Sequence, residues 1–156
     1  MNASPWMSRL WTASLSLLAV TGLAQMPLFN RYYMTSIPGL SWLGDFGLTH
    51  SLHYLAAAVF LFQVCYWIAN TCFARGWGLT STGRWRVLAL ALLVVTGLVR
   101  VSKNDPDLWY SPSVVMAVDW AHLAAMMLFG VLALTARRLS QPYLVQIMEK
   151  RPPRMD

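Results

Sequence analysis

Residues 46–74 contain no Asp, Glu, Lys or Arg, and this uninterrupted stretch constrains the fold more than any other feature of the sequence. A helix of about 20 mostly apolar residues crosses the hydrocarbon core of a bilayer, so the segment is long enough to span it. Together with three other apolar segments it predicts spans at about 10–29, 46–73, 85–101 and 112–136. Backbone groups in lipid have no water to bind, so the spans are predicted to be helices.

The composition agrees with lipid as the main solvent, because 57% of the residues are hydrophobic and only 12% are charged. A soluble domain usually has about 25% charged residues. We expect one membrane domain over residues 1–156, an all-α integral membrane four-helix bundle with a tail at 137–156. The net charge of +6 does not indicate a nucleic-acid partner, because the basic residues lie beside apolar segments rather than in a soluble patch.

The distribution of Lys and Arg predicts the orientation of the chain. Nine of the 12 lie before the first span, between spans two and three, or in the tail, which leaves three in the other two loops. Both termini are therefore predicted to be cytoplasmic, in the inner membrane of a bacterium. The outer loops, at about 30–45 and 100–111, are rich in aromatic residues and suit a membrane interface or a docking surface.

The two cysteines, Cys65 and Cys72, lie in an apolar stretch and are expected to be buried free thiols. They form neither CxxC nor CxxCH, which argues against thiol exchange and against covalent haem attachment. A thiol–quinone enzyme is disfavoured because the outer loops contain no cysteine pairs. We find no internal repeat in the sequence.

The histidines carry the main functional prediction, because ionisable groups within spans are costly and indicate function. By helix rise, His53 lies about 10 Å and His122 about 15 Å below the outer boundary. Two imidazoles at comparable depth on separate helices are the axial ligands that a six-coordinate b-type haem requires. For any single histidine, a hydrogen bond to a neighbouring helix is the alternative.

Four other polar residues have two or more interpretations each. His50 competes with His53, but only one of them can face a haem squarely, and His50 lies closer to the boundary, where a propionate, quinone or partner contact fits better. Asp119 is placed to orient His122, to relay a proton, or to be satisfied within the bundle. Arg100 and Lys103 are either propionate contacts or ordinary boundary cations.

Four stretches resemble the membrane cytochrome b subunits of formate dehydrogenases and nickel–iron hydrogenases. The similarity covers roughly residues 8–136. It is carried by SLLAVTGL (16–23), LHYLAAAVFLF (52–62), ALLVVTGLVRV (91–101) and DWAHLAAMMLFGVLAL (119–134).

The resemblance implies a four-helix bundle with a redox partner outside the membrane, either an iron–sulfur protein or a multihaem cytochrome, and a quinone or menaquinone within it. His53 and His122 match the ligand positions of one family haem. The positions that would hold a second haem, near 8–12 and after His122, contain no histidine, so one haem b is expected. A quinone site would then lie in the outer half, with His50, Tyr54 and Asp119 as candidate contacts.

The sequence therefore predicts a haem b-containing anchor and electron-transfer subunit of a respiratory oxidoreductase complex. It would pass electrons between the quinone pool and a periplasmic iron–sulfur or cytochrome partner. We expect no catalysis by this chain alone. The alternative is a cofactor-free membrane anchor or assembly subunit whose histidines only brace the bundle.

Overall fold

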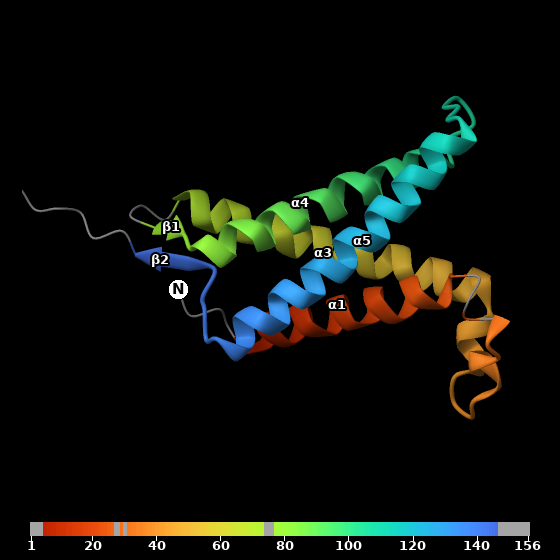
Figure 1. Cartoon of the computed structure of the whole chain (residues 1–156), viewed down its shortest axis with the longest axis horizontal. Coiled ribbons are helices and arrows are strands. Elements are labelled where there is room, and N and C mark those ends of the chain that lie inside the picture. Colours follow the sequence, from red (N-terminus) through yellow and green to blue (C-terminus); the bar gives the residue numbers. More distant parts are fainter. Residues whose placement is uncertain (1–4, 27–28, 30, 74–76, 147–156) are drawn as a thin grey trace, which may run out of the picture. The chain divides into compact units, whose positions relative to one another are not determined.

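A computed structural model describes residues 5–26, 29, 31–73 and 77–146 (Figure 1). Its main elements are four long helices: α1 (Pro5–Ala24), α3 (Phe46–Phe73), α4 (Ser81–Ser102) and α5 (Pro112–Arg138). The last three agree closely with the predicted spans, whereas α1 begins and ends earlier than expected.

Three of these helices have the length and apolar composition needed to cross a membrane: α3 over Phe46–Thr71, α4 and α5. In the described part of the chain α1 does not meet the same criteria. Large apolar side chains on the three helices are exposed, including Leu55 at 63%, Phe62 at 67% and Leu134 at 63%. An apolar surface of this kind is expected where a protein faces lipid, so the structure is consistent with a multi-pass membrane protein.

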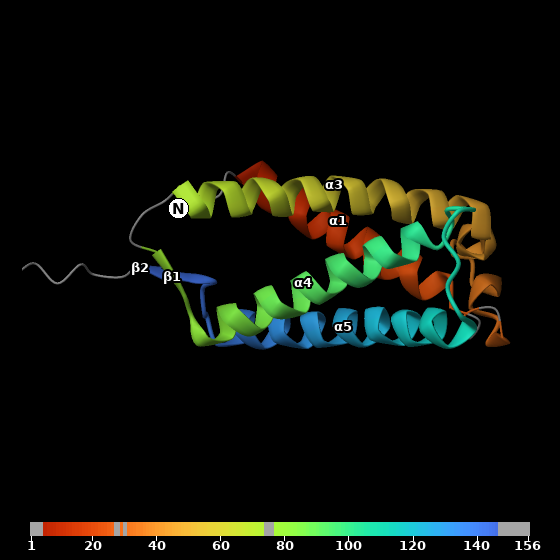
Figure 2. The ribbon, with the colours of Figure 1, turned by 90° about the horizontal axis from the view of Figure 1, so that it is seen from above.

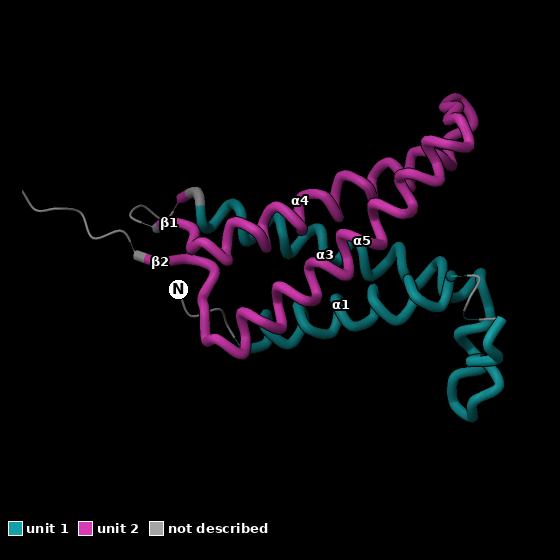
Figure 3. Tube along the Cα trace, in the orientation of Figure 1, with its two compact units in different colours: residues 1–72 teal, residues 73–156 magenta. Residues whose placement is uncertain are grey.

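The chain divides into two compact units, Met1–Cys72 and Phe73–Asp156, which Figure 3 shows in different colours. The long helices of the first unit are α1 and α3, here called the first helix pair. Those of the second unit are α4 and α5, the second helix pair. Each unit is described by itself below.

In the first unit, aromatic and polar side chains join the two long helices. The rings of Trp11 and Phe60 lie 4.8 Å apart between centroids. Deeper along α3, Gln63 is only 2% exposed. Its Nε2 donates to Ser14 Oγ at 3.0 Å and to the carbonyl oxygen of Val59 at 3.3 Å. Within the described residues its Oε1 has no hydrogen-bond partner.

The segment between α1 and α3 contains two short 3-10 helices, η1 (Met34–Ser36) and η2 (Ser41–Gly44). Gly39, between them, has a φ of 86°, a conformation that residues with a side chain rarely adopt. Asp45 then starts α3, since its carboxylate accepts from the backbone N–H of Leu48 at 3.0 Å. The chain is thereby turned back into the second long helix of the unit.

In the second unit, α4 and α5 pack side by side (Figure 2). Small residues allow this close packing, with Ala89 on α4 and Ala125 on α5 each 2% exposed. Both helices have an N-terminal cap. Thr80 accepts from the N–H of Gly83 at 2.9 Å, and Ser111 accepts from that of Val114 at 3.4 Å.

The second unit also contains a small antiparallel sheet, in which β1 (Trp77–Leu79) pairs with β2 (Leu144–Gln146). The apolar residues from Leu139 to Lys150 could suggest a short surface helix, which Pro142 argues against; the structure has no such helix over 139–146, and residues 147–150 lie outside the described part. The carbonyl of Pro142 instead accepts from Arg86 Nη2 at 2.8 Å, and that of Tyr143 accepts from the N–H of Thr80 at 3.1 Å. These bonds hold the segment extended against α4.

Candidate functional site: two histidine–threonine pairs

His53, on the early part of α3, contacts Thr21 near the end of α1. The distance between His53 Nδ1 and Thr21 Oγ1 is 2.8 Å. Thr21 is completely buried and the histidine is partly buried. The imidazole is therefore fixed through one ring nitrogen by the neighbouring helix of the same unit.

His122, on α5, makes the corresponding contact in the second unit. Its Nδ1 lies 2.8 Å from Oγ1 of Thr96 on α4, and Thr96 is 7% exposed. In both units the threonine lies in the last turns of the first helix and the histidine lies in the early turns of the second. The two predicted ligands are thus held in equivalent surroundings.

A glycine follows each threonine and lies against the imidazole edge. A Cβ added at Gly22 would be 3.3 Å from Cε1 of His53, and one added at Gly97 would be 3.5 Å from Cε1 of His122. A methyl group would therefore be tight against the ring at Gly22 and in ordinary van der Waals contact with it at Gly97. Because glycine has no side chain, each of these positions leaves room for the imidazole that the neighbouring threonine orients.

These contacts reveal a local repeat, so the expectation of no internal repeat is wrong. The segment VTGL occurs at 20–23 and again at 95–98. Each histidine is followed three residues later by a buried alanine and seven residues later by a buried phenylalanine. These residues are Ala56 and Phe60 in one unit and Ala125 and Phe129 in the other, all 7% exposed or less.

Thr21 and Thr96 are the site residues that sequence reasoning missed. The recurrence of VTGL at 20–23 and 95–98 could have indicated them, although the two copies lie far apart in the sequence. Threonine in a span is ordinarily explained by a bond to its own helix, so only the structure shows that each one also contacts a histidine.

His50 has a different environment from His53. Its ring stacks on Phe46 with a centroid distance of 5.4 Å and contacts Tyr54 at 4.3 Å. The three rings follow one face of α3 at intervals of four residues. Two of the candidate quinone contacts, His50 and Tyr54, are therefore brought together, whereas Asp119 belongs to the other unit.

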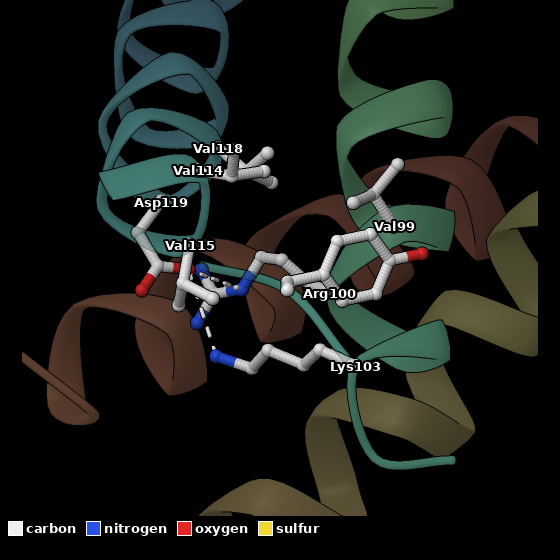
Figure 4. Close-up of a pocket in the computed structure, with 8 residues that line it drawn as sticks. Val99, Arg100, Lys103, Val114, Val115, Val118 and Asp119 are labelled. Carbon is white, nitrogen blue, oxygen red and sulfur yellow. Dashed lines mark ion pairs between the residues drawn. The ribbon is translucent and has the colours of Figure 1, made fainter. Parts of the chain in front are cut away.

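Asp119 forms ion pairs with the two cations predicted to be propionate contacts (Figure 4). Its Oδ1 is 3.2 Å from Arg100 Nε and 3.9 Å from Lys103 Nζ. They line a small hollow together with valines of both helices: Val99, Val114, Val115 and Val118. Asp119 does not orient His122 through Nδ1, because Thr96 occupies that nitrogen.

The described thiols and acidic groups do not form a conventional metal site. Cys65 is a free thiol and is exposed, so the expectation of burial is wrong for it; the side chain of Cys72 lies outside the described part. Among the described residues no three His, Cys, Asp or Glu side chains form a group that would hold a metal ion. A porphyrin supplies four of the ligands of its own iron, so two separate imidazoles are a donor set that suits haem.

Together these features define a predominantly helical, membrane-type protein with one threonine-bound histidine in each of its two units. Comparisons with protein-family models, with curated proteins and with solved structures gave no match.

Proposed function

We propose that this protein is a haem b-containing membrane anchor and electron-transfer subunit of a respiratory oxidoreductase complex. Electrons would pass between the quinone pool and a periplasmic iron–sulfur or cytochrome partner. The observation that carries the proposal is the equivalence of the two histidine–threonine pairs. In each pair a threonine of the neighbouring helix contacts Nδ1 of a partly buried imidazole, and a contact of this kind is what usually orients a histidine that binds iron through its other nitrogen.

In this proposal His53 and His122 would each supply one imidazole nitrogen to the haem iron. Bound haem would supply reversible one-electron transfer without further catalytic groups. The residues of the chain would contribute the two imidazoles, with Gly22 and Gly97 leaving room for these rings, and an apolar environment. Apolar surroundings favour the iron state of lower net charge and so influence the potential.

Arg100 and Lys103 have a weaker claim as propionate contacts, because Asp119 is already their partner. A propionate would have to share these cations with the carboxylate. His50 and Tyr54 remain the better placed candidates for a quinone contact, since both rings are accessible in part on one helix face. Aromatic rings make favourable offset-stacked or edge-to-face contacts, which a quinone ring could form with this cluster.

The decisive experiment is a reduced-minus-oxidised visible spectrum of the full chain, expressed with haem supply and purified in detergent. We expect a sharp b-type α band that is lost in His53→Ala and in His122→Ala. The matched control is His50→Ala, which removes a neighbouring imidazole of the same helix and should retain the band. If fully folded wild-type protein shows no band after haem loading, the cofactor-free anchor is the correct function.

The place in a larger complex needs a separate measurement. Gentle extraction of the native protein, followed by mass spectrometry of the chains that co-purify, should recover a redox subunit with iron–sulfur or haem centres. In sealed vesicles, turnover should move little net charge across the membrane, because the proposed haem and quinone site both lie in the outer half. Strong generation of membrane potential would contradict that arrangement.

A further inference from the structure

We propose that Thr21 and Thr96 are positioning residues that fix each imidazole as the tautomer with its proton on Nδ1 and its lone pair on Nε2. The benefit of this tautomer rests on the proposed haem function. The tautomer itself is a property of the protein without haem and can be measured in that form.

The hydrogen bonds of each threonine hydroxyl determine which nitrogen of the paired histidine carries the proton. A hydroxyl group has one proton to donate and two lone pairs to accept with. Thr21 Oγ1 lies 2.7 Å from the carbonyl oxygen of Leu17, and Thr96 Oγ1 lies 2.7 Å from that of Leu92. A carbonyl only accepts, so at this short distance the hydroxyl proton is committed to the backbone.

The bond to histidine must then run in the other direction. Since each hydroxyl donates to its own helix, it can only accept from the imidazole, and the 2.8 Å contacts are bonds from Nδ1–H to Oγ1. A neutral imidazole carries a single N–H, so Nε2 is the nitrogen with the lone pair. The same arrangement occurs in both units.

The tautomer matters because iron binds the unprotonated nitrogen of a neutral imidazole. Ligand histidines characteristically donate their other N–H to an acceptor, which fixes the ring orientation and strengthens the ligand as an electron donor. Here the acceptor is a threonine hydroxyl that donates its own proton to a backbone carbonyl of its helix. Each threonine would therefore influence the iron indirectly, by orienting the histidine.

The first measurement uses the full chain without haem, labelled with ¹⁵N-histidine, in detergent. Nitrogen chemical shifts should identify His53 and His122 as protonated on Nδ1 and unprotonated on Nε2. His50, whose ring stacks on Phe46 and has a tilted contact with Tyr54, serves as an internal comparison without a threonine contact in the described structure. Protonation of Nε2 in either histidine of a pair would overturn the inference without any variant.

Variants then test the role of the hydroxyl. Thr21→Val and Thr96→Val keep the side-chain shape and remove the acceptor, so the tautomer ratio of the paired histidine should change about fivefold or more. Thr21→Ser and Thr96→Ser retain the hydroxyl and should keep the wild-type tautomer ratio. The control is Thr135→Val on α5, because Thr135 also donates to its own helix, at 2.9 Å from the carbonyl of Val131, but contacts no histidine in the described structure.

In haem-loaded protein the valine variants should have a more positive reduction potential, because the ligand loses electron-donating strength. The serine variants and Thr135→Val should keep the wild-type value. Unchanged tautomers and an unchanged potential in both valine variants would overturn the inference even if haem binds. Threonine-dependent tautomers in a protein that never binds haem would support the inference and reject the proposed function.

Discussion

The guanidinium carbon of Arg86 lies 3.7 Å from the centre of the Tyr143 ring. Arg86 is 4% exposed, and its Nη2 also donates to the carbonyl oxygens of Gln141 at 3.2 Å and Pro142 at 2.8 Å. The buried side chain of Arg86, near the start of α4, thus binds residues 141–143, which follow α5. The small sheet of β1 and β2 forms beside this contact.

Arg86→Met should release the segment 141–146 without unfolding the helices. Hydrogen bonds from a charged donor contribute about 1.5–3 kcal/mol each, so the loss of two should make opening at least about tenfold more frequent. Hydrogen–deuterium exchange of the β1 and β2 amides measures this. Arg84→Met removes an exposed cation of the same turn and is the control; equal protection in both variants would contradict the assignment.

The same contact predicts a dependence on alkaline pH. Burial raises the pKa of the Tyr143 phenol above its ordinary value, and the nearby Arg86 partly opposes this shift. Because the folded pKa is the higher one, no stability is lost below about pH 10, and stability falls as the pH rises through the folded value. Proteolysis of the segment after α5 should therefore increase only above about pH 10. Tyr143→Phe should remove that increase.

The glycines beside the histidines predict a graded effect of alanine. Gly22→Ala places a methyl group 3.3 Å from His53 Cε1, which requires the ring or helix to shift, whereas Gly97→Ala meets His122 at an ordinary contact distance of 3.5 Å. Haem occupancy, measured by absorbance per protein, should fall clearly in the first variant and little in the second. Gly130→Ala, with no atom within 4 Å of the added methyl group, is the control.

Asp119→Asn should have a small effect on stability. The side chains of Asp119 and Arg100 are 40% and 37% exposed, and ion pairs with such exposure contribute about 0–1 kcal/mol. Thermal unfolding in detergent should show a modest loss at low salt that disappears at high salt. The b-type band should remain, since Thr96 rather than Asp119 holds His122; loss of the band would assign the carboxylate a direct role at the haem.

Ser14 and Gln63 predict an asymmetry between two substitutions. Ser14→Ala leaves the buried amide without one of its acceptors and should destabilise the protein by about 1–3 kcal/mol. Gln63→Leu removes the whole amide, including the Oε1 that has no hydrogen-bond partner in the described structure. The loss of unfolding free energy should therefore be smaller than for Ser14→Ala, although the substitution deletes a larger polar group. Unfolding by denaturant or heat compares the two; a larger loss for Gln63→Leu would contradict this account.

The sequence predicted the helices well because their apolar content is nearly continuous. Residues 46–73 were predicted as a span and form α3, and α5 begins at Pro112 as expected. The end of α1 was harder to place, because the apolar pattern continues past Ala24 while the backbone helix does not. The strand at 144–146 was missed because its partner lies more than sixty residues earlier, and β pairing over such a separation has no local signal.

The candidate site was predicted only in part for a similar reason. Depth along a helix indicated His53 and His122, but the partner of each Nδ1 depends on which helix packs alongside. Asp119 was an obvious candidate because it precedes His122 by one turn. Thr96 is twenty-six residues from His122 in the chain, and only tertiary packing makes it the partner.

The bond between Gln63 and Ser14 has a consequence for the level at which His53 stands. Gln63 is ten residues further along α3, about 15 Å from the histidine by helix rise. If α3 slid along α1 by one turn, about 5.4 Å, the buried amide would lose Ser14 and keep only the carbonyl oxygen of Val59 on its own helix. A buried polar contact between α1 and α3 thus sets the register of the two helices, and with it the position of the imidazole relative to Thr21.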